Sequence, residues 1–257
     1  WEKIAGPALG TIVTPNTANT PLNNLIQGVY QFKLTVTDNN GATGTDTIQV
    51  TVNEAPVANA GTDIIIIPPS NSTTITGSGT DTDGTIMAYA WVKISGPVSG
   101  IIVLPGNAVT NLNNLVQGIY QFELTVTDNN GAQGKDTIQV TVNQAPVANA
   151  GADKLVNLPL NIVTLTGSGT DTDGTISSYL WTKISGPVSG SIVTSNTAST
   201  VVNALLQGVY LFELTVTDNN GASGKDTVLV TVNQAPVANA GADKLIHLPV
   251  SSVTLTG

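Results

Sequence analysis

The feature that most constrains the fold of this chain is a repeat with a period of 90 residues. Trp1, Trp91 and Trp181 each open a W-x-K-I segment, and TDNNGA recurs at 37, 127 and 217. Solenoid units repeat every ~20–50 residues, so this longer period corresponds to a whole domain. The 257 residues therefore hold just under three copies of one domain.

Both ends of the chain are out of phase with this repeat. We therefore expect four parts: a partial domain with the C-terminal strands at 1–53, whole domains at 54–143 and 144–233, and the first strands of another domain at 234–257. Two explanations remain open. The chain is a window on a longer array, or the partial domains of different chains complete one another in a filament.

Composition excludes several classes of protein. Cysteine is absent, which rules out disulfides, iron–sulfur clusters and thiol nucleophiles. The eight basic residues are all lysine and the net charge is −9, so binding to nucleic acid is not expected. No apolar run approaches the ~18 residues of a membrane span. The abundant Thr, Asn and Ser suit a polar β-sheet surface.

Alternating apolar residues predict β-strands throughout one repeat. Residues 210–218 alternate strictly, a DNNG turn follows, and 226–233 alternate again, which predicts a β-hairpin. Further strands are expected at 163–167 and 175–184, with one or two short strands in 191–206. A first strand over 146–158 should be broken by glycine.

About seven short strands per repeat, with no helical period, predict an immunoglobulin-like β-sandwich. Trp91 and Trp181, with Tyr89 and Tyr179 two residues before them, are expected in the cores. The predicted fold class is all-β, with tandem 90-residue sandwiches arranged as an elongated rod.

The segments PVANAGxD, GSGTDTDGTIxxYxW and GxYxFxLTVTDNxGAxGxDTxxVTVN resemble the PKD domain, an Ig-like repeat of cell-surface proteins and bacterial secreted enzymes. In place of the WDFGDG motif of that family, this chain has WVKISGP or WTKISGP. The variant is similar to the PKD-related repeats of large bacterial adhesins and of the KIAA0319-like group. The resemblance implies a non-catalytic, extracellular protein used for spacing, adhesion or accessory binding.

The repeated DTDG segments at 81–84 and 171–174 are candidate calcium loops. They are not EF-hands, because position twelve from Asp81 is Val92 instead of the required Glu. In an Ig-like sandwich these loops, the DNNG turn and the domain entry share one pole, and the resemblance implies that some PKD domains bind Ca²⁺ there. Ordinary Asx turns explain the same residues. The candidate oxygen ligands are Asn53, Asp81, Asp83 and Asp128 at one pole, and Asn143, Asp171, Asp173 and Asp218 at the next.

Asp-Thr-aliphatic triplets place Thr47, Thr137 and Thr227 on the outward face of a strand. The triplet resembles the acceptor of a bacterial O-glycosylation system. Three residues are a weakly specific pattern, and a strand threonine exposed to solvent is the default explanation.

The second copy carries apolar residues where the third is polar. Its Ile64, Ile67, Ile101 and Leu104 correspond to Lys154, Asn157, Ser191 and Thr194. We hypothesise that this domain packs laterally against another chain, since bare apolar edges aggregate. Sequence drift or repacking within the domain explains the difference equally well.

No residue pattern indicates an enzyme. The single histidine, His247, occurs in one copy only, so a Ser–His–Asp set lacks a repeated base. We expect a bacterial surface stalk, adhesin or filament whose partners are copies of itself, surface glycans or other cells, with Ca²⁺ as the one candidate cofactor. The alternative is an accessory carbohydrate-binding or spacer module of a secreted hydrolase.

Overall fold

The computed structural model describes residues 1–257 and contains only strands, turns and loops. The all-β fold class is as predicted. The chain divides into two compact units, Trp1–Asn143 and Gln144–Gly257, and each is described by itself. No helix of the structure is long and apolar enough to span a membrane.

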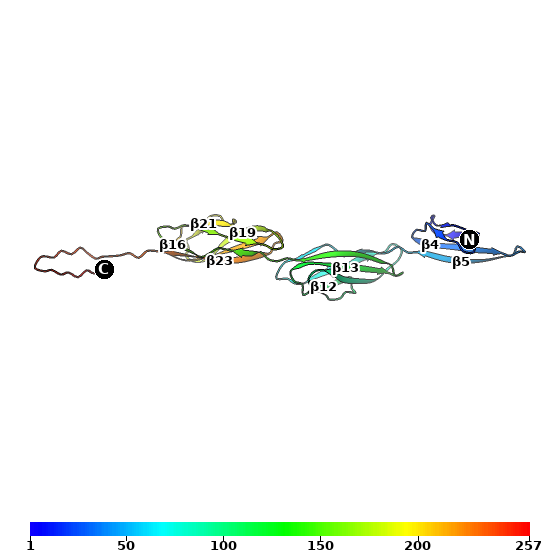
Figure 1. The fold of residues 1–257 in the computed structure, drawn as a ribbon, viewed down its shortest axis with the longest axis horizontal. Coiled ribbons are helices and arrows are strands. Elements are labelled where there is room, and N and C mark those ends of the chain that lie inside the picture. The colour runs from blue at the N-terminus through cyan, green and yellow to red at the C-terminus, as the bar shows by residue number, and fades with distance from the viewer. The chain divides into compact units, whose positions relative to one another are not determined.

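Residues 1–53 form an open, partial sandwich (Figure 1). A three-stranded sheet has the order β1-β4-β5, and β2 pairs with β3. The strands are β1 (Glu2–Ala5), β2 (Thr11–Ile12), β3 (Leu22–Asn23), β4 (Gly28–Thr37) and β5 (Thr43–Val52).

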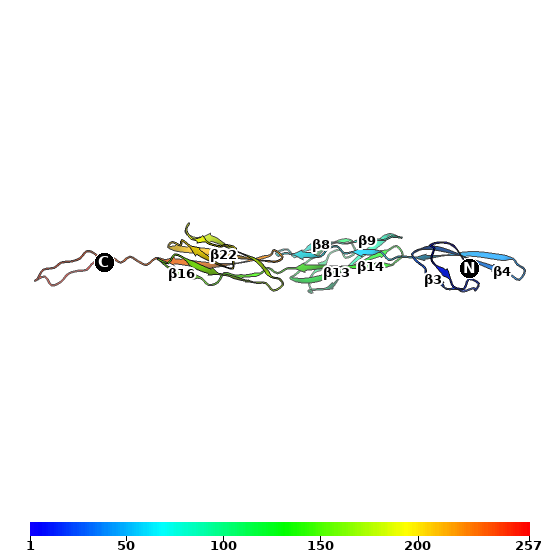
Figure 2. The same ribbon diagram turned by 90° about the horizontal axis from the view of Figure 1, so that it is seen from above.

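Residues 54–143 form a two-layered sandwich. One layer is the sheet β10-β13-β14-β7, and the other contains the sheet β11-β12-β8 and the pair β6-β9. Figure 2 shows β8 and β9 on the side of this domain opposite β13 and β14. The strands are β6 (Val57–Asn59), β7 (Ile64–Ile66), β8 (Thr73–Thr76), β9 (Ser78–Thr80), β10 (Ile86–Ser95), β11 (Ile101–Ile102), β12 (Val109–Asn113), β13 (Gly118–Asp128) and β14 (Gln133–Val142).

Residues 144–233 repeat this topology, with sheets β16-β23-β22-β19 and β17-β21-β20 and the pair β15-β18. The strands are β15 (Val147–Asn149), β16 (Lys154–Asn157), β17 (Val163–Thr166), β18 (Ser168–Thr170), β19 (Ile176–Ser185), β20 (Ser191–Ile192), β21 (Ser199–Asn203), β22 (Gly208–Asp218) and β23 (Ser223–Asn233).

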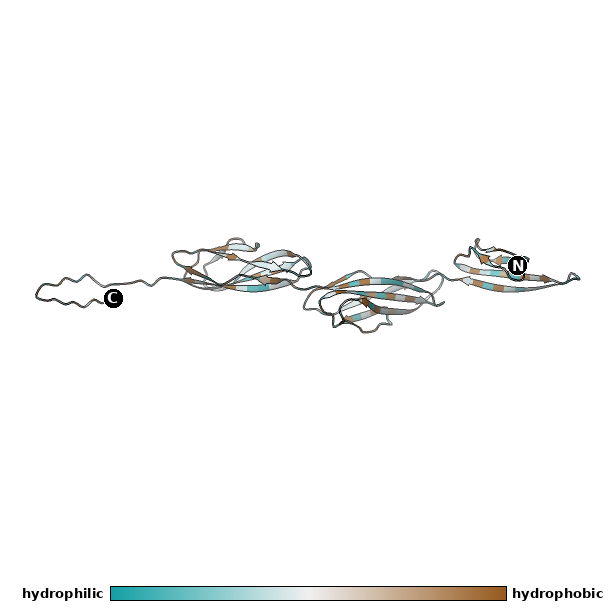
Figure 3. Ribbon diagram, in the orientation of Figure 1, coloured by the Kyte–Doolittle hydropathy of each residue, from teal (hydrophilic) through white to brown (hydrophobic).

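The alternating residues of the long hairpin build each core. In β22, Tyr210, Phe212, Leu214 and Val216 are fully buried, and Figure 3 shows the resulting bands of apolar and polar residues along the strands. Trp91 and Trp181 are buried in the cores as expected. Tyr89 and Tyr179 differ from the expectation, because they are only partly buried and pack at the margins of the two core clusters.

The first strand of a repeat is two strands that join different sheets. In the third copy, β15 pairs antiparallel with β18, whereas β16 pairs parallel with β23. Gly151 lies between them with φ +81°, and a Cβ there would meet the Thr166 carbonyl oxygen at 2.7 Å. Asp226 Oδ2 accepts the N–H of Ala150 at 2.8 Å beside this crossing.

The two terminal parts lack elements that the whole domains contain. In 1–53, Val36 and Ile48 are 59% and 52% exposed, because this part lacks the strands equivalent to β6, β7, β8 and β9. Their counterparts Val126 and Ile138 are buried. Residues 234–257 contain no strand and are exposed throughout.

Candidate functional site

The loops at one pole of domain 54–143 gather around the linker that enters it. Asn53 Nδ2 donates to Asp128 Oδ2 at 2.6 Å, and the N–H of Glu54 donates to Asp83 Oδ2 at 3.2 Å. Thr82 Oγ1 donates to Glu54 Oε2 at 2.8 Å. These three hydrogen bonds connect the linker to the 81–84 loop and to the turn that follows β13. We call this set of contacts the junction clasp.

Asp128 organises the turn after β13. Its side chain is 2% exposed, and its Oδ1 accepts the backbone N–H groups of Asn130 and Ala132 at 2.8 and 2.9 Å. The hydrogen bond from Asn53, followed by those from the turn, holds the pKa of Asp128 below its ordinary value, although burial opposes this shift. Asp128 therefore acts as an ionised acceptor that joins linker and turn.

Asp81 is in the opposite situation. Its Oδ1 accepts the N–H of Asp83 at 3.3 Å, but its Oδ2 is buried and has no hydrogen-bond partner. Burial raises the pKa of Asp81, and the neighbouring carboxylates of Asp83 and Asp128 raise it further. A buried carboxylate oxygen without a partner is costly. This oxygen is therefore the feature of the pole that most needs an explanation.

Gly84 leaves space in front of this oxygen. A Cβ there would lie 2.6 Å from Asp81 Oδ2 and would also clash with Asn129 Oδ1. The third copy has the same arrangement, with a buried Asp171 Oδ2 that lacks a partner and faces Gly174. In both copies, therefore, an aspartate oxygen and an asparagine side-chain oxygen lie beside the glycine of the loop.

The structure brings Asn53, Asp81, Asp83 and Asp128 to one pole, but it connects several of them directly. Asn53 presents its amide nitrogen to Asp128, whereas its oxygen accepts from Asn130. No group of three or more Asp, Glu, His or Cys residues has an arrangement that could hold a metal ion. Asp81 Oδ2 is buried without a partner, whereas Asn129 Oδ1 accepts the N–H of Thr85 at 2.7 Å.

The predicted residues of the next pole are placed as follows. Asp173 Oδ2 accepts the N–H of Gln144 at 3.0 Å, and Asp218 Oδ1 accepts from the turn that follows β22. Asn143 is buried, and its backbone N–H donates to the Ile66 carbonyl at 2.9 Å.

The Asp-Thr-aliphatic triplets have a structural role that the sequence did not reveal. Asp136 Oδ2 accepts the N–H of Ala60, as Asp226 does from Ala150, each at 2.8 Å. The recurrence of this aspartate in every copy was the available signal. Thr47, Thr137 and Thr227 are exposed.

The apolar residues specific to the second copy lie mostly on its surface. Ile67, Ile101 and Leu104 are 40%, 55% and 53% exposed, whereas Ile64 packs partly against the core. The exposed side chains do not fill a gap within their own domain.

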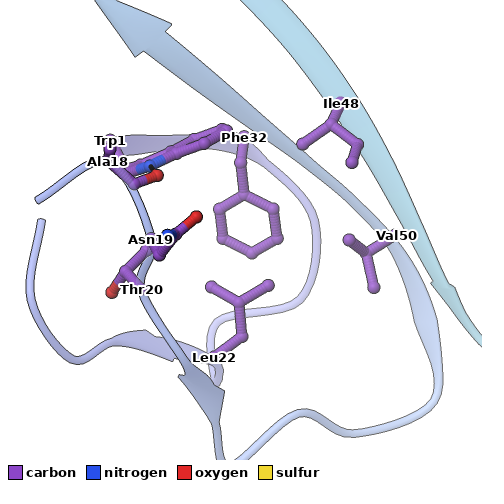
Figure 4. Close-up of a pocket in the computed structure, with 8 residues that line it drawn as sticks. All are labelled: Trp1, Ala18, Asn19, Thr20, Leu22, Phe32, Ile48 and Val50. Atoms are coloured by element: carbon purple, nitrogen blue, oxygen red, sulfur yellow. Dashed lines mark hydrogen bonds between the residues drawn. The ribbon is translucent and has the colours of Figure 1, made fainter.

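An apolar hollow opens in residues 1–53 (Figure 4). Phe32 lies between Trp1 and Leu22 on one side and Ile48 and Val50 on the other. In domain 54–143 the corresponding space is closed, and Ile75 of β8 is completely buried there. The lining residues are Trp1, Ala18, Asn19, Thr20, Leu22, Phe32, Ile48 and Val50.

Comparison with protein families gives a match to the K319L-like PKD domain over residues 1–52, 60–142 and 150–232. The chain belongs to this family. The Dyslexia-associated protein KIAA0319 homolog of mouse is 38% identical over 271 residues, covering all of this chain and 25% of the relative. Human KIAA0319 is 36% identical over the same length, again with 25% of the relative covered. The chain thus spans about a quarter of these relatives, which are mammalian and give no support to a bacterial origin.

Solved PKD domains align with single repeats of the chain. The PKD domain of the KIAA 1837 protein is 34% identical, with 38% of this chain and 97% of that domain covered and a TM-score of 0.34. The PKD domain of human KIAA0319 (residues 329–428) is 27% identical, with 39% and 91% covered and a TM-score of 0.33.

Proposed function

We propose that this chain is a non-enzymatic, extracellular array of PKD domains that acts as a structural spacer or in adhesion. The family assignment supports the extracellular role. The aspartates at the pole of domain 54–143 hold the linker, because Asp83 and Asp128 both accept hydrogen bonds from the domain entry. The narrower version, a bacterial stalk or filament, rests on the sequence resemblance alone.

The observation that carries this proposal is the junction clasp. Asn53 and Glu54, which precede the first strand of a domain, are bonded to two loops of that same domain. A linker held in this way has little freedom to bend, which is the property that a spacer requires. A rod of such domains would be ~100 Å or longer, at ~3.3 Å per strand residue.

Small-angle scattering of the chain tests the spacer role. We expect a maximum dimension of ~100 Å or more, and a broader distribution of lengths when Asn53→Gly and Thr82→Ala remove two of the three hydrogen bonds of the clasp. Thr172→Ala in the next copy is a matched comparison, because Thr172 Oγ1 donates to Gln144 in the same way. A compact particle, or lengths unchanged by the double substitution, would refute a stiff spacer.

Calcium at the pole is a second candidate, favoured by the buried Asp81 Oδ2. Ca²⁺ prefers carboxylate and amide oxygens, and the carboxylate oxygen Asp81 Oδ2 and the amide oxygen Asn129 Oδ1 both lie beside Gly84. Binding there would satisfy the oxygen and stiffen the junction. The residues predicted for this role in the third copy, Asp171 and Asp173, have the same loop sequence.

Thermal unfolding with added CaCl₂ or EDTA tests this site. We expect Ca²⁺ to raise the Tm, and Asp81→Asn with Asp171→Asn to abolish the effect. Glu123→Gln serves as the control, because Glu123 forms an exposed ion pair with Lys135 away from the pole. Equal responses of wild type and the double variant would eliminate this site.

Completion of partial domains between chains is a further part of the proposal. The hollow beside Phe32 is an apolar surface without covering strands. The exposed segment 234–257 has the sequence of such strands, because its counterpart 144–167 supplies β15, β16 and β17 in the third copy. A peptide of residues 234–257 should bind the chain and quench or shift Trp1 fluorescence, and Leu255→Asp in the peptide should prevent binding. No binding by the wild-type peptide would refute completion between chains.

Lateral association through the second domain is tested by crosslinking. Ile101→Cys should give disulfide-linked dimers under mild oxidation, whereas Ser191→Cys at the matched position of the third copy should not. Equal yields would show that the Ile-rich surface has no special role.

Two proposals remain, namely surface glycans as partners and O-glycans on Thr47, Thr137 and Thr227. The intact mass of the protein before and after alanine substitution of these threonines tests the modification. A carbohydrate-binding module of a hydrolase ranks below the spacer role. Such a module requires exposed aromatic rings, yet Trp91, Trp181, Tyr120 and Tyr210 are buried.

A further inference from the structure

The same Asn-Gly pair closes the long hairpin in each copy. Asn40-Gly41, Asn130-Gly131 and Asn220-Gly221 lie in turns of identical DNNGA sequence. Glycine has no side chain to hinder its backbone nitrogen, so an Asn-Gly pair is the sequence most open to attack of that nitrogen on the asparagine side chain. Every copy therefore carries the chemistry for spontaneous deamidation.

The first two copies have matching backbones in this turn. The Asn40 N–H donates to Asp38 Oδ1 at 2.9 Å, and the Asn130 N–H donates to Asp128 Oδ1 at 2.8 Å. Gly41 and Gly131 have φ values of +89° and +90°, and their N–H groups donate to the Asp38 and Asp128 carbonyls at 3.2 and 3.3 Å. Backbone geometry thus gives no reason for different reactivity.

The side chains differ. Asn130 Nδ2 donates to Asn53 Oδ1 beside the junction clasp, and this hydrogen bond holds the carboxamide in place. The carboxamide of Asn40 forms no hydrogen bond in the structure, and the residue is exposed. The same local sequence therefore exists in a held state and in an unheld state within one chain.

We propose that Asn130 is a self-modification site of the junction and that Asn53 restrains it. The nitrogen of Gly131 attacks Cγ of Asn130, a new C–N bond forms, and the carboxamide nitrogen leaves as ammonia. Water then opens the cyclic succinimide to aspartate or isoaspartate. The reaction consumes one water and releases one ammonia, with no oxidant, enzyme or metal.

Deamidation removes the hydrogen bond to Asn53 that restrained Asn130. A carboxylate at position 130 no longer donates to Asn53 Oδ1, and two oxygens then face each other. The new negative charge also lies in the turn beside Asp128, at a pole that already contains Asp81 and Asp83. Like charges repel at this distance, so the modified junction is looser. Deamidation of Asn130 with time would therefore make the linker more flexible.

Peptide mapping of the aged protein tests the restraint. Cleavage after lysine places Asn40, Asn130 and Asn220 in the separate peptides 34–93, 94–135 and 184–225, so each site is followed by its own mass increase. At mildly alkaline pH we expect Asn130 to deamidate about fivefold more slowly than Asn40, the factor that corresponds to one hydrogen bond of about 1 kcal/mol. Asn53→Ala should bring Asn130 to the rate of Asn40 while leaving Asn40 unchanged. Equal rates in the wild type, or an unaltered Asn130 rate in the variant, would overturn the restraint.

A second measurement tests the consequence. Hydrogen exchange at the Glu54 amide, which donates to Asp83, reports on the clasp. Asn130→Asp should speed exchange there, whereas the matched Asn40→Asp should not. If both variants leave the Glu54 amide equally protected, the modification does not open the junction.

Discussion

Residues 143–155 and 233–245 have the same sequence but different structures. In the first stretch, Val147–Asn149 is a strand and Ala150 is 1% exposed. In the second stretch β23 ends at Asn233 and no strand follows, and Val237 and Leu245 are 89% and 82% exposed. Identical local preferences therefore give a strand in one place and none in the other.

The difference separates local from distant contributions. The turn at Gly241 is kept, with its N–H bonded to Asn239 Oδ1 at 2.9 Å, as at Gly151. The strand is lost, because it needs β18 and the hairpin of its own domain as partners. The Asx turn thus depends on local sequence alone, whereas the strand forms only where partner strands and a core are present.

The largest expected effect comes from a cavity in the core of domain 144–233. Leu165→Ala should destabilise domain 144–233 by about 2–5 kcal/mol, because Leu165 is completely buried. The equivalent Leu255→Ala should change stability by less than ~0.5 kcal/mol. Urea denaturation measures both, and similar losses would show that 234–257 is packed in solution.

A smaller loss is expected from the aspartate that accepts the Ala60 amide. Asp136→Ala should cost about 1.5–3 kcal/mol, since it removes a hydrogen bond to a charged acceptor. Asp46→Ala is the matched control, because Asp46 bonds only its neighbour Thr47. Denaturant midpoints should differ clearly between the two variants; equal midpoints would remove this role from the aspartate.

The pH dependence of the pole should show two opposite signs. The pKa of Asp128 is lowered on folding, so its contribution is present above the unfolded value of ~3.9 and is lost as the pH falls through the folded value. The pKa of Asp81 is raised, so its contribution is present below the unfolded value and is lost as the pH rises through the folded value.

Substitutions at neutral pH in EDTA test these signs. Asp128→Asn should lower the melting temperature of domain 54–143, and Asp81→Asn should raise it or leave it unchanged. Melting curves from pH 3 to 7 follow both variants. A lower melting temperature for Asp81→Asn throughout this range would contradict the assignment of a strained carboxylate.

The smallest effect is expected at the surface residues that distinguish the two whole domains. Ile101→Ser, which copies Ser191, should change the stability of the monomer by less than ~0.5 kcal/mol, because Ile101 is exposed. Calorimetry at low concentration measures this. A larger loss would mean that Ile101 packs within its own domain.

Much of the fold follows from patterns with a period of two. Phe212, Val228 and Val230 were expected to be buried from alternation alone, and they are. The division of the first strand between two sheets could not be predicted, because the partners of β15 and β16 come from distant segments. The position of Tyr179 at the margin of the core was missed for the same reason.

The sequence predicted where the candidate site lies, but not which hydrogen bonds its residues form. Topology brought the DTDG loop and the turn to one pole, yet whether Asn53 would offer Asp128 its nitrogen or its oxygen depends on contacts 75 residues apart. The buried Asp81 Oδ2 has no signature in the sequence either.

Hydrogen exchange of two matched amides tests most directly the claim that these strands exist only on a completed core. Ala150 donates to Asp226 Oδ2, whereas Ala240 occupies the same place in an identical sequence without that contact. We predict strong protection at Ala150 and exchange near the unprotected rate at Ala240. Equal protection of the two amides would contradict this claim.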